Sequence, residues 1–494
     1  MNSDPARIPV IIGVGQFNDR DCIHDALGLM VAALEKADED AGGGWIGKLD
    51  SIAVVNQISF PKLGNCAEHL AQHFGISPKI IEQTPYPTGE SPVQLLNEAA
   101  NRIGSGEIGI AAIVGAEALR TAAERARAAT GEKKDALREV ASGGAKSVMH
   151  QHGLVAPTDL YPLYENATRA AWGQSLAEAQ AESGIIWAGM SAVAAGNENA
   201  WIRKPQTSDA ITSIEADNRP IAFPYQKRMV ANSSVNQGAG FIVTSLAVAR
   251  AAGVPEERII HVGMGAAAHE THNMLKRDQY VQPAGMVVTI EETLKRNKLK
   301  TADLDHVELY SCFPCVPKMA RRILGWPVEK PITAFGGLTF GGGPIGNYMS
   351  HAIASMVDKL RAERGTALLF ANGGYATHFH GIVLSADPLP DASFPHDYDV
   401  NPLADTMRGP VPEIDDDYEG PAAIESYTVF YNRDGSVRFG TIIARTSADA
   451  RVLARVDAAD EAMIALLTDG KAEPVGAVGI TARGEDGLIH WAAA

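Results

Sequence analysis

Ile8-Pro-Val-Ile-Ile-Gly-Val-Gly15 is an uncharged apolar run that predicts a buried strand. Apolar side chains at helical spacing follow over residues 22–38, and the order of strand then helix recurs along the chain. Strands that alternate with helices in this way indicate a layered α/β protein with buried sheets. The other strands predicted for this part of the chain are residues 52–55, 108–115, 238–245, 259–263, 307–310, 366–370 and 381–385.

Two segments interrupt the alternation and divide the chain. Residues 118–200 hold long amphipathic stretches with little strand signal, which predicts a helical insertion. Residues 387–423 are rich in Pro and Asp, the composition of a linker. Beyond the linker, apolar strands flank the turn Asn432-Arg-Asp-Gly435 and predict a hairpin. The predicted units are an N-terminal half (1–117 and 201–240), the insertion (118–200), a C-terminal half (241–386), the linker (387–423) and a small β domain (424–494).

Composition narrows the classes of function. The chain has 494 residues with 43 Lys and Arg against 59 Asp and Glu, and its net charge of −16 argues against nucleic-acid partners. Four cysteines are too few for a disulfide framework in a chain of this length, which favours a reducing compartment. No signal peptide or membrane-spanning run is recognisable, so we expect a cytoplasmic protein without membrane contact.

The densest glycine cluster is Gly336-Gly-Leu-Thr-Phe-Gly-Gly-Gly-Pro-Ile-Gly346. No Lys-Ser or Lys-Thr pair closes it, so it does not match a phosphate-binding P-loop. It also comes too late in the chain for a dinucleotide-binding fingerprint, which belongs to the first strand–helix turn. Close packing and ligand contact both stay open for this loop.

Cysteine and histidine supply the candidate chemistry. Cys312-Phe-Pro-Cys315 has no second ligand pair, so a zinc site is not expected, while packing cysteines, a redox pair and a pocket thiol stay open. His378 and His380 share one face of a predicted strand, where either could be a general base or a packed core residue. His351 lies four residues after Asn347 on one helix face, turned either to solvent or into a pocket.

Several separate stretches of the chain resemble motifs of the thiolase superfamily and occur in the same order along the sequence. They are most similar to the thiolase-like proteins of type 1, which are often labelled acetyl-CoA acetyltransferases. The resemblance covers about residues 8–386, and the tail around Tyr427–Gly435 is similar to the additional C-terminal domain of the type 1 proteins. It implies an α/β fold, a thiolase-like five-layer α-β-α-β-α sandwich of two halves, plus a small mainly-β, OB-like C-terminal domain. The stretches that carry it are residues 8–15, 219–227, 235–239, 310–313, 336–346 and 372–374.

The motifs depart from those of a working thiolase. The stretch that matches the Cys-Ser-Thr-Gly turn reads Tyr86-Pro-Thr-Gly89, so Tyr86 takes the place of the nucleophile. Gly343 stands where a Gly-His-Pro motif has histidine, and Asn372 precedes the Gly-Gly pair that follows the second catalytic cysteine of thiolases. Tyrosine, with an ordinary pKa of about 10, is a poor substitute for an acyl-carrying cysteine.

The resemblance implies coenzyme A as a co-substrate, no metal and a small acyl substrate, and leaves homodimer and monomer open. Our hypothesis is a CoA-dependent acyltransferase-type enzyme. It would cleave or form the C–C bond of a 3-oxo acid or 3-oxoacyl compound in a retro-Claisen reaction, by direct attack of the CoA thiol. The alternative is a non-catalytic CoA-binding, acyl-CoA-binding or partner-recruiting protein. The predicted catalytic residues are His378, His380, His351 and Cys312, and the predicted substrate-binding residues are Tyr86, Glu90, Asn347, Asn372, Gly343 and Gly374.

Overall fold

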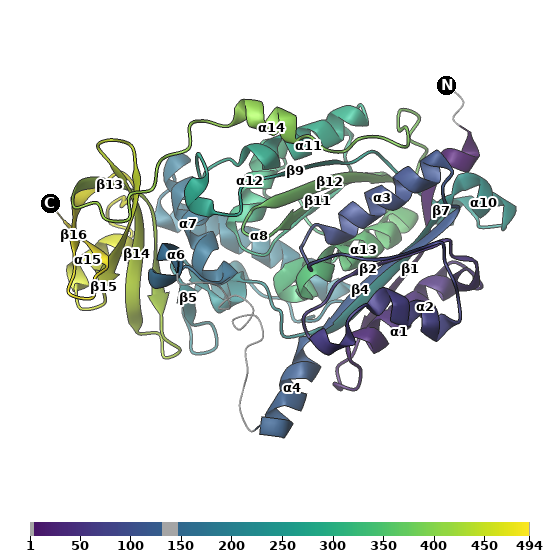
Figure 1. Ribbon diagram of the computed structural model, residues 1–494, viewed down its shortest axis with the longest axis horizontal. Coiled ribbons are helices and arrows are strands. Elements are labelled where there is room, and N and C mark those ends of the chain that lie inside the picture. Colours follow the sequence, from purple (N-terminus) through teal and green to yellow (C-terminus); the bar gives the residue numbers. More distant parts are fainter. Residues whose placement is uncertain (1–3, 131–146, 494) are drawn as a thin grey trace.

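The main body has two α/β halves stacked around two central helices (Figure 1). The computed structural model describes residues 4–130 and 147–493 of the chain. The central helices are α3 (Ser91–Ser105) and α13 (Tyr348–Glu363), and each contacts strands of both halves. The predicted thiolase-like layering is confirmed, with helices outside both sheet layers and between them. The outer helices are α1 (Ala26–Asp40), α2 (Cys66–Phe74) and α10 (Leu246–Ala251) on one side, and α11 (Ala284–Arg296), α12 (Cys315–Leu324) and α14 (Asn401–Met407) on the other.

The strands of the two halves join into one sheet. Its order is β10-β11-β12-β8-β1-β7-β4-β2-β3, with β9 paired to β12, so hydrogen bonds between β8 and β1 connect the halves at their edges. The sheet therefore folds around the central helices. Its strands are β1 (Pro9–Asn18), β2 (Ser51–Val55), β3 (Ile80–Gln83), β4 (Ile110–Ala118), β7 (Asn236–Ser245), β8 (Ile260–Val262), β9 (Ala266–His269), β10 (His306–Leu309), β11 (Thr366–Gly373) and β12 (His378–Ser385).

The opening apolar run forms β1 and lies under α1. A Cβ at Gly13 would lie 2.2 Å from the carbonyl oxygen of Ala37, and one at Gly15 would lie 2.1 Å from that of Ala33. The two glycines therefore let the backbone of α1 rest directly on the strand, which fixes the first outer layer.

The part of the chain between β4 and β5 (Pro220–Ala222) is helical in its described residues, and residues 131–146 of the predicted insertion lie outside them. A buried ion pair ties it to the C-terminal half, because Lys318 of α12 lies 2.5 Å from Glu165 of α7. Tyr225 donates a further hydrogen bond of 2.9 Å to Glu165. The described helices of this region are α4 (Leu119–Thr130), α6 (Val148–Gln151), α7 (Pro157–Ala171), α8 (Leu176–Gly196) and α9 (Ser208–Thr212).

The tail forms a closed β barrel at one end of the molecule (Figure 1). The predicted hairpin is present, since β13 (Gly420–Tyr431) and β14 (Val437–Thr446) pair antiparallel. The pairings β14–β15, β15–β17, β17–β16 and β16–β13 then close the barrel. Its other elements are β15 (Arg451–Asp457), α15 (Glu461–Thr468), β16 (Val478–Arg483) and β17 (Ile489–Ala493). The exact limits of the predicted units stay predictions.

The barrel is anchored to the body by hydrogen bonds of buried groups. Arg451 is 1% exposed and donates to the carbonyl oxygens of Leu275 and Arg277. The hairpin of β5 (Pro220–Ala222) and β6 (Tyr225–Gln226) extends the barrel sheet, because β5 pairs with β13. The barrel and the body therefore share one hydrogen-bonded sheet.

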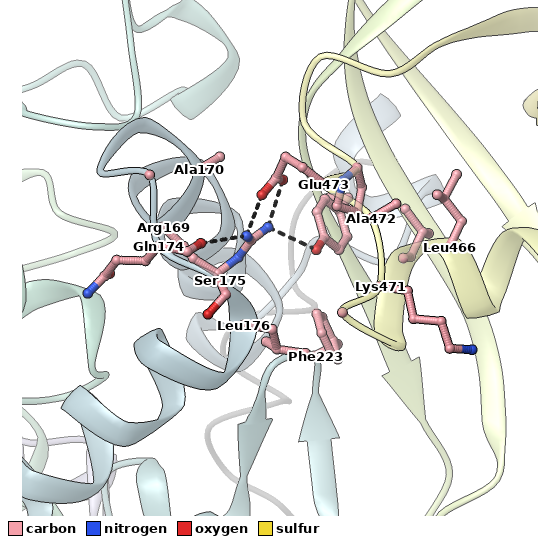
Figure 2. Close-up of a pocket in the computed structure, with 15 residues that line it drawn as sticks. Arg169, Ala170, Gln174, Ser175, Leu176, Phe223, Leu466, Lys471, Ala472 and Glu473 are labelled. Carbon is pink, nitrogen blue, oxygen red and sulfur yellow. Dashed lines mark hydrogen bonds and ion pairs between the residues drawn. The ribbon is translucent and has the colours of Figure 1, made fainter.

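A cavity of about 380 Å³ separates the insertion from the barrel (Figure 2). Arg169, at the end of α7, reaches across it and forms a two-bond ion pair with Glu473 of the barrel. Arg169 is only 4% exposed, so its positive charge has little contact with water. Glu473 and the carbonyl oxygen of Gln174 stabilise that charge. The Arg169–Glu473 ion pair at this cavity joins the insertion to the barrel. None of the predicted site residues lines the cavity.

No helix among residues 4–130 and 147–493 combines the length and the apolar character that crossing a membrane requires. All four cysteines are free thiols. In the same described ranges, no group of three or more His, Cys, Asp or Glu side chains is arranged to hold a metal ion.

Candidate active site

Three chain segments meet at the N-terminus of α3. They are the turn before the helix, the loop after β10 and the end of β11. A Cβ at Gly89 would lie 2.2 Å from the carbonyl oxygen of Asn372 and 2.5 Å from the Tyr310 hydroxyl. A Cβ at Gly373 would lie 1.8 Å from Oε2 of Glu90. The helix start and the strand end can approach this closely only because both positions are glycine.

Cys312 and Asn372 are brought together at this point. The amide of Asn372 lies 3.8 Å from Sγ of Cys312 and donates a hydrogen bond of 2.9 Å to the Tyr161 hydroxyl. That hydroxyl donates to the carbonyl oxygen of Gly374 and accepts from the backbone N–H of Ala376. Tyr161 comes from the insertion, which sequence reasoning did not connect to the site. Burial raises the pKa of the Cys312 thiol to about 12, so it is protonated at neutral pH.

Glu90, at the start of α3, lies against Gly373 at the end of β11. The carboxyl is 8% exposed, Oε1 accepts a hydrogen bond of 2.8 Å from Thr88, and Oε2 has no hydrogen-bond partner. Burial raises the pKa of Glu90 to about 7, because no cation compensates the loss of water. A buried acid that titrates near neutrality is a common feature of catalytic sites.

The glycine cluster forms a buried loop next to the start of α3. It contains a π-helical turn over Gly337–Gly341, and Gly346 lies against Pro87. A buried carboxyl, Glu308, holds the base of the loop through Thr333 and the N–H of Ala334.

Two residues with strained backbone lie in the 336–346 loop and in the turn after Gly373 and Gly374. Ile345 has a φ of 42° and Ala376 a φ of 55°. These are left-handed conformations that cost a non-glycine residue about 1–3 kcal/mol and that collect at functional sites.

The three predicted histidines have different neighbours. His351 is fully buried on α13, 2.8 Å from Gln16 and stacked on Phe335. His380 is 1% exposed beside Tyr398. Burial lowers the pKa of both to about 3, so both are neutral at physiological pH.

His378 is half-buried and is the strand partner of Gly373. Its ring lies 5.1 Å from that of His272 and 6.3 Å from that of His269. Burial, with the like charges of these neighbours, lowers its pKa to about 4. Because β12 alternates, His378 and His380 share a face, but their rings contact different neighbours.

Of the remaining predicted binding residues, one is exposed to solvent and two are buried. Tyr86 is 72% exposed, and Gly343 is buried under the carbonyl oxygen of Asn232. Asn347 is 1% exposed and donates to the carbonyl oxygens of Gly115 and Ala239, so its amide ties α13 to β4 and β7. Of the predicted residues, the structure therefore brings together Glu90, Cys312, Asn372 and Gly374.

The comparisons with known proteins agree with this architecture. A crystal structure described as a monomeric SCP2-thiolase like protein type 1 from Mycobacterium smegmatis is 29% identical, with a TM-score of 0.83 over 99% of this chain and 100% of that one. Human mitochondrial 3-ketoacyl-CoA thiolase in complex with CoA is 15% identical, with a TM-score of 0.59 over 78% of this chain and 99% of that one. Acetyl-CoA acetyltransferase from Syntrophomonas wolfei is 16% identical, with a TM-score of 0.57 over 77% and 99%.

The two stacked halves with a helical insertion thus define a thiolase-like fold. Residues 403–485 match the family model described as the thiolase-like protein type 1 additional C-terminal domain. The chain is accordingly similar over its whole length to a thiolase-like protein of type 1, and residues 403–485 carry the additional C-terminal domain of that type. The search of curated proteins gave no match.

Proposed function

We propose that this chain handles acyl-CoA substrates and cleaves or forms the C–C bond of a 3-oxo acid or 3-oxoacyl compound. The thiolase-like fold supports an acyl-CoA-related function. One observation carries the finer proposal: the buried carboxyl of Glu90 at the N-terminus of α3 meets the Asn372–Gly374 turn, and the side chain of Asn372 in that turn contacts Cys312.

The proposed reaction needs no covalent enzyme intermediate. The sulfur of CoA forms a bond to the 3-oxo carbon, the C2–C3 bond breaks, and its electron pair passes to C2 as an enolate. A proton on C2 completes a new acyl-CoA and a shortened acid or acyl product. The positive end of the α3 dipole favours the negative charge that develops beside it.

Two predicted catalytic residues fit this reaction. The Cys312 thiol stays protonated, so its proposed role is hydrogen-bond donation and not nucleophilic attack. His378 is neutral, half-buried and next to Gly374, which makes it the proposed acceptor of the CoA thiol proton. His351 and His380 take no step in this proposal, because both rings are buried apart from the cluster.

The proposal is tested by mass spectrometry of the protein incubated with CoA and a panel of 3-oxo acids and 3-oxoacyl-CoAs. We expect a new acyl-CoA that forms with the native protein and not with heat-denatured protein. Variants C312S and H378A should form it at least tenfold more slowly. Saturable binding of CoA without a new thioester across the panel would reject C–C cleavage.

A non-catalytic acyl-CoA-binding protein is the second candidate. It is favoured by the protonation states of the predicted catalytic residues, because a thiol with a pKa of about 12 is no nucleophile and histidines with a pKa of about 3–4 are weak bases. The same incubation distinguishes the candidates, since a binding protein retains CoA or acyl-CoA and returns it unchanged.

A further inference from the structure

The carboxyl of Glu90 does not serve as an ordinary helix cap. Glu90 is the residue before α3, but its side chain accepts no hydrogen bond from the backbone of the first turn. Thr88 donates to Oε1, and Oε2 is buried without a donor. Leaving a buried carboxyl oxygen unpaired is costly, so a stabilising role for Glu90 does not explain its position.

The orphaned oxygen of Glu90 lies where the start of α3 meets the end of β11. Oε2 is next to Gly373, where any side chain would collide with it. The preceding residue, Asn372, carries a second buried acceptor without a donor, Oδ1, and is 1% exposed. The unpaired Oε2 of Glu90 favours a bound molecule that brings a proton to this point, while the side chain of Asn372 faces Tyr161 and Cys312.

The titratable groups around Glu90 are uncharged at neutral pH, so none of them fixes the protonation state of its carboxyl. The Tyr310 phenol and the Cys312 thiol are the titratable groups on the β10 loop, and burial raises the pKa of both, so neither is charged at neutral pH. On the β11–β12 side the titratable residues are His378, which is neutral, Tyr375 and Tyr161, and burial raises the pKa of both phenols. No Lys or Arg contributes to the shift of the Glu90 pKa to about 7, so acid and carboxylate coexist near neutrality.

We propose that Glu90 is a catalytic acid–base residue that exchanges a proton between its Oε2 and C2 of a bound acyl thioester. The inference rests on the proposed function. In the cleavage direction, the carboxylic acid gives its proton to C2 as the C2–C3 electron pair arrives there. In the direction of bond formation, the carboxylate removes a C2 proton, and the electron pair of the C–H bond moves into the enolate of the thioester.

The half-reaction is tested without any C–C cleavage. Acetyl-CoA and butanoyl-CoA are incubated with the full chain in D₂O, and deuterium at C2 is followed by NMR and mass spectrometry. The native protein should accelerate exchange, and E90Q should lower the rate at least about 100-fold, the scale of general acid–base catalysis. E98Q is the matched control, because Glu98 lies on the same helix about 12 Å further along its axis and should leave the rate unchanged.

E90D is the second variant. It keeps a carboxyl group but shortens the side chain by one methylene, which moves the carboxyl away from the proposed position of C2. It should retain acyl-CoA binding, lower exchange at least tenfold and keep a rate that rises with pH about a midpoint near 7, as in the native protein. Exchange in E90Q or E90D at the native rate, or no exchange by native protein saturated with acyl-CoA, would overturn the inference. Glu90-dependent exchange without any new acyl-CoA in the cleavage assay would instead reject the proposed C–C cleavage alone.

Discussion

Replacing Glu90 by Gln should change how stability depends on pH. Burial raises the pKa of Glu90 from its ordinary value of 4.5 to about 7. Between these values the folded protein keeps a proton that the unfolded chain has lost, so this group's contribution to stability falls as pH rises across the window. Glutamine has no proton to lose. At about 1.4 kcal/mol per pKa unit, E90Q should gain about 3 kcal/mol relative to the native protein between pH 4.5 and pH 8.5.

The measurement is urea unfolding followed by tryptophan fluorescence at pH 4.5, 6, 7 and 8.5. The difference between E90Q and native protein should grow in favour of E90Q with a midpoint between pH 5 and 7. E35Q, which alters an exposed side chain on α1, should give a difference that does not change with pH. Parallel stability profiles for E90Q and native protein would refute the reasoning, because they would mean that Glu90 ionises equally in the folded and unfolded chain.

Three further substitutions test the contacts around the site. K318M should lower the free energy of unfolding by about 3–5 kcal/mol, measured by urea unfolding, because it leaves the carboxylate of Glu165 buried without its partner; a change below 1 kcal/mol would contradict that. E473Q should cost about 1–3 kcal/mol and speed hydrogen–deuterium exchange over residues 466–476, because Arg169 loses its charged partner; unchanged exchange would exclude a docking role. G373A should cost about 1–3 kcal/mol in urea unfolding and displace the carboxyl at the start of α3, since the new methyl occupies its place; native stability would show that the strand end can move aside.

The strand–helix alternation in the sequence was sufficient for the layered fold, because buried strands and amphipathic helices have distinct periods. The same reasoning missed β3, β9 and the joining of both halves through β8 and β1. Short strands of three or four residues carry too few apolar positions for a period to register. The β5–β6 hairpin was missed for a related reason, because its pairing partner β13 lies some 200 residues further along the chain and leaves no local signal.

The predicted site residues that the structure brings together come from motifs at glycine loops, and the predicted histidines have other neighbours. Glu90 and Asn372 were named from their places in motifs, and both lie in the cluster. His351 was judged from helix spacing alone, which shows that it shares a face with Asn347 but not that the face is fully buried. Tyr161 carried no motif, and only the docking of the insertion reveals its contact with the site.

The shared sheet between β5 and β13 has a consequence for shortened forms of the chain. A chain that stopped before Gly420 would leave β5 without its partner strand and the carbonyl oxygens of Leu275 and Arg277 without the guanidinium of Arg451. Those polar groups would meet solvent or pair with another molecule's edge. Removal of the tail would thus expose an unpaired strand edge on the thiolase-like body that favours association with other molecules. The body and the barrel therefore have to be produced and studied together.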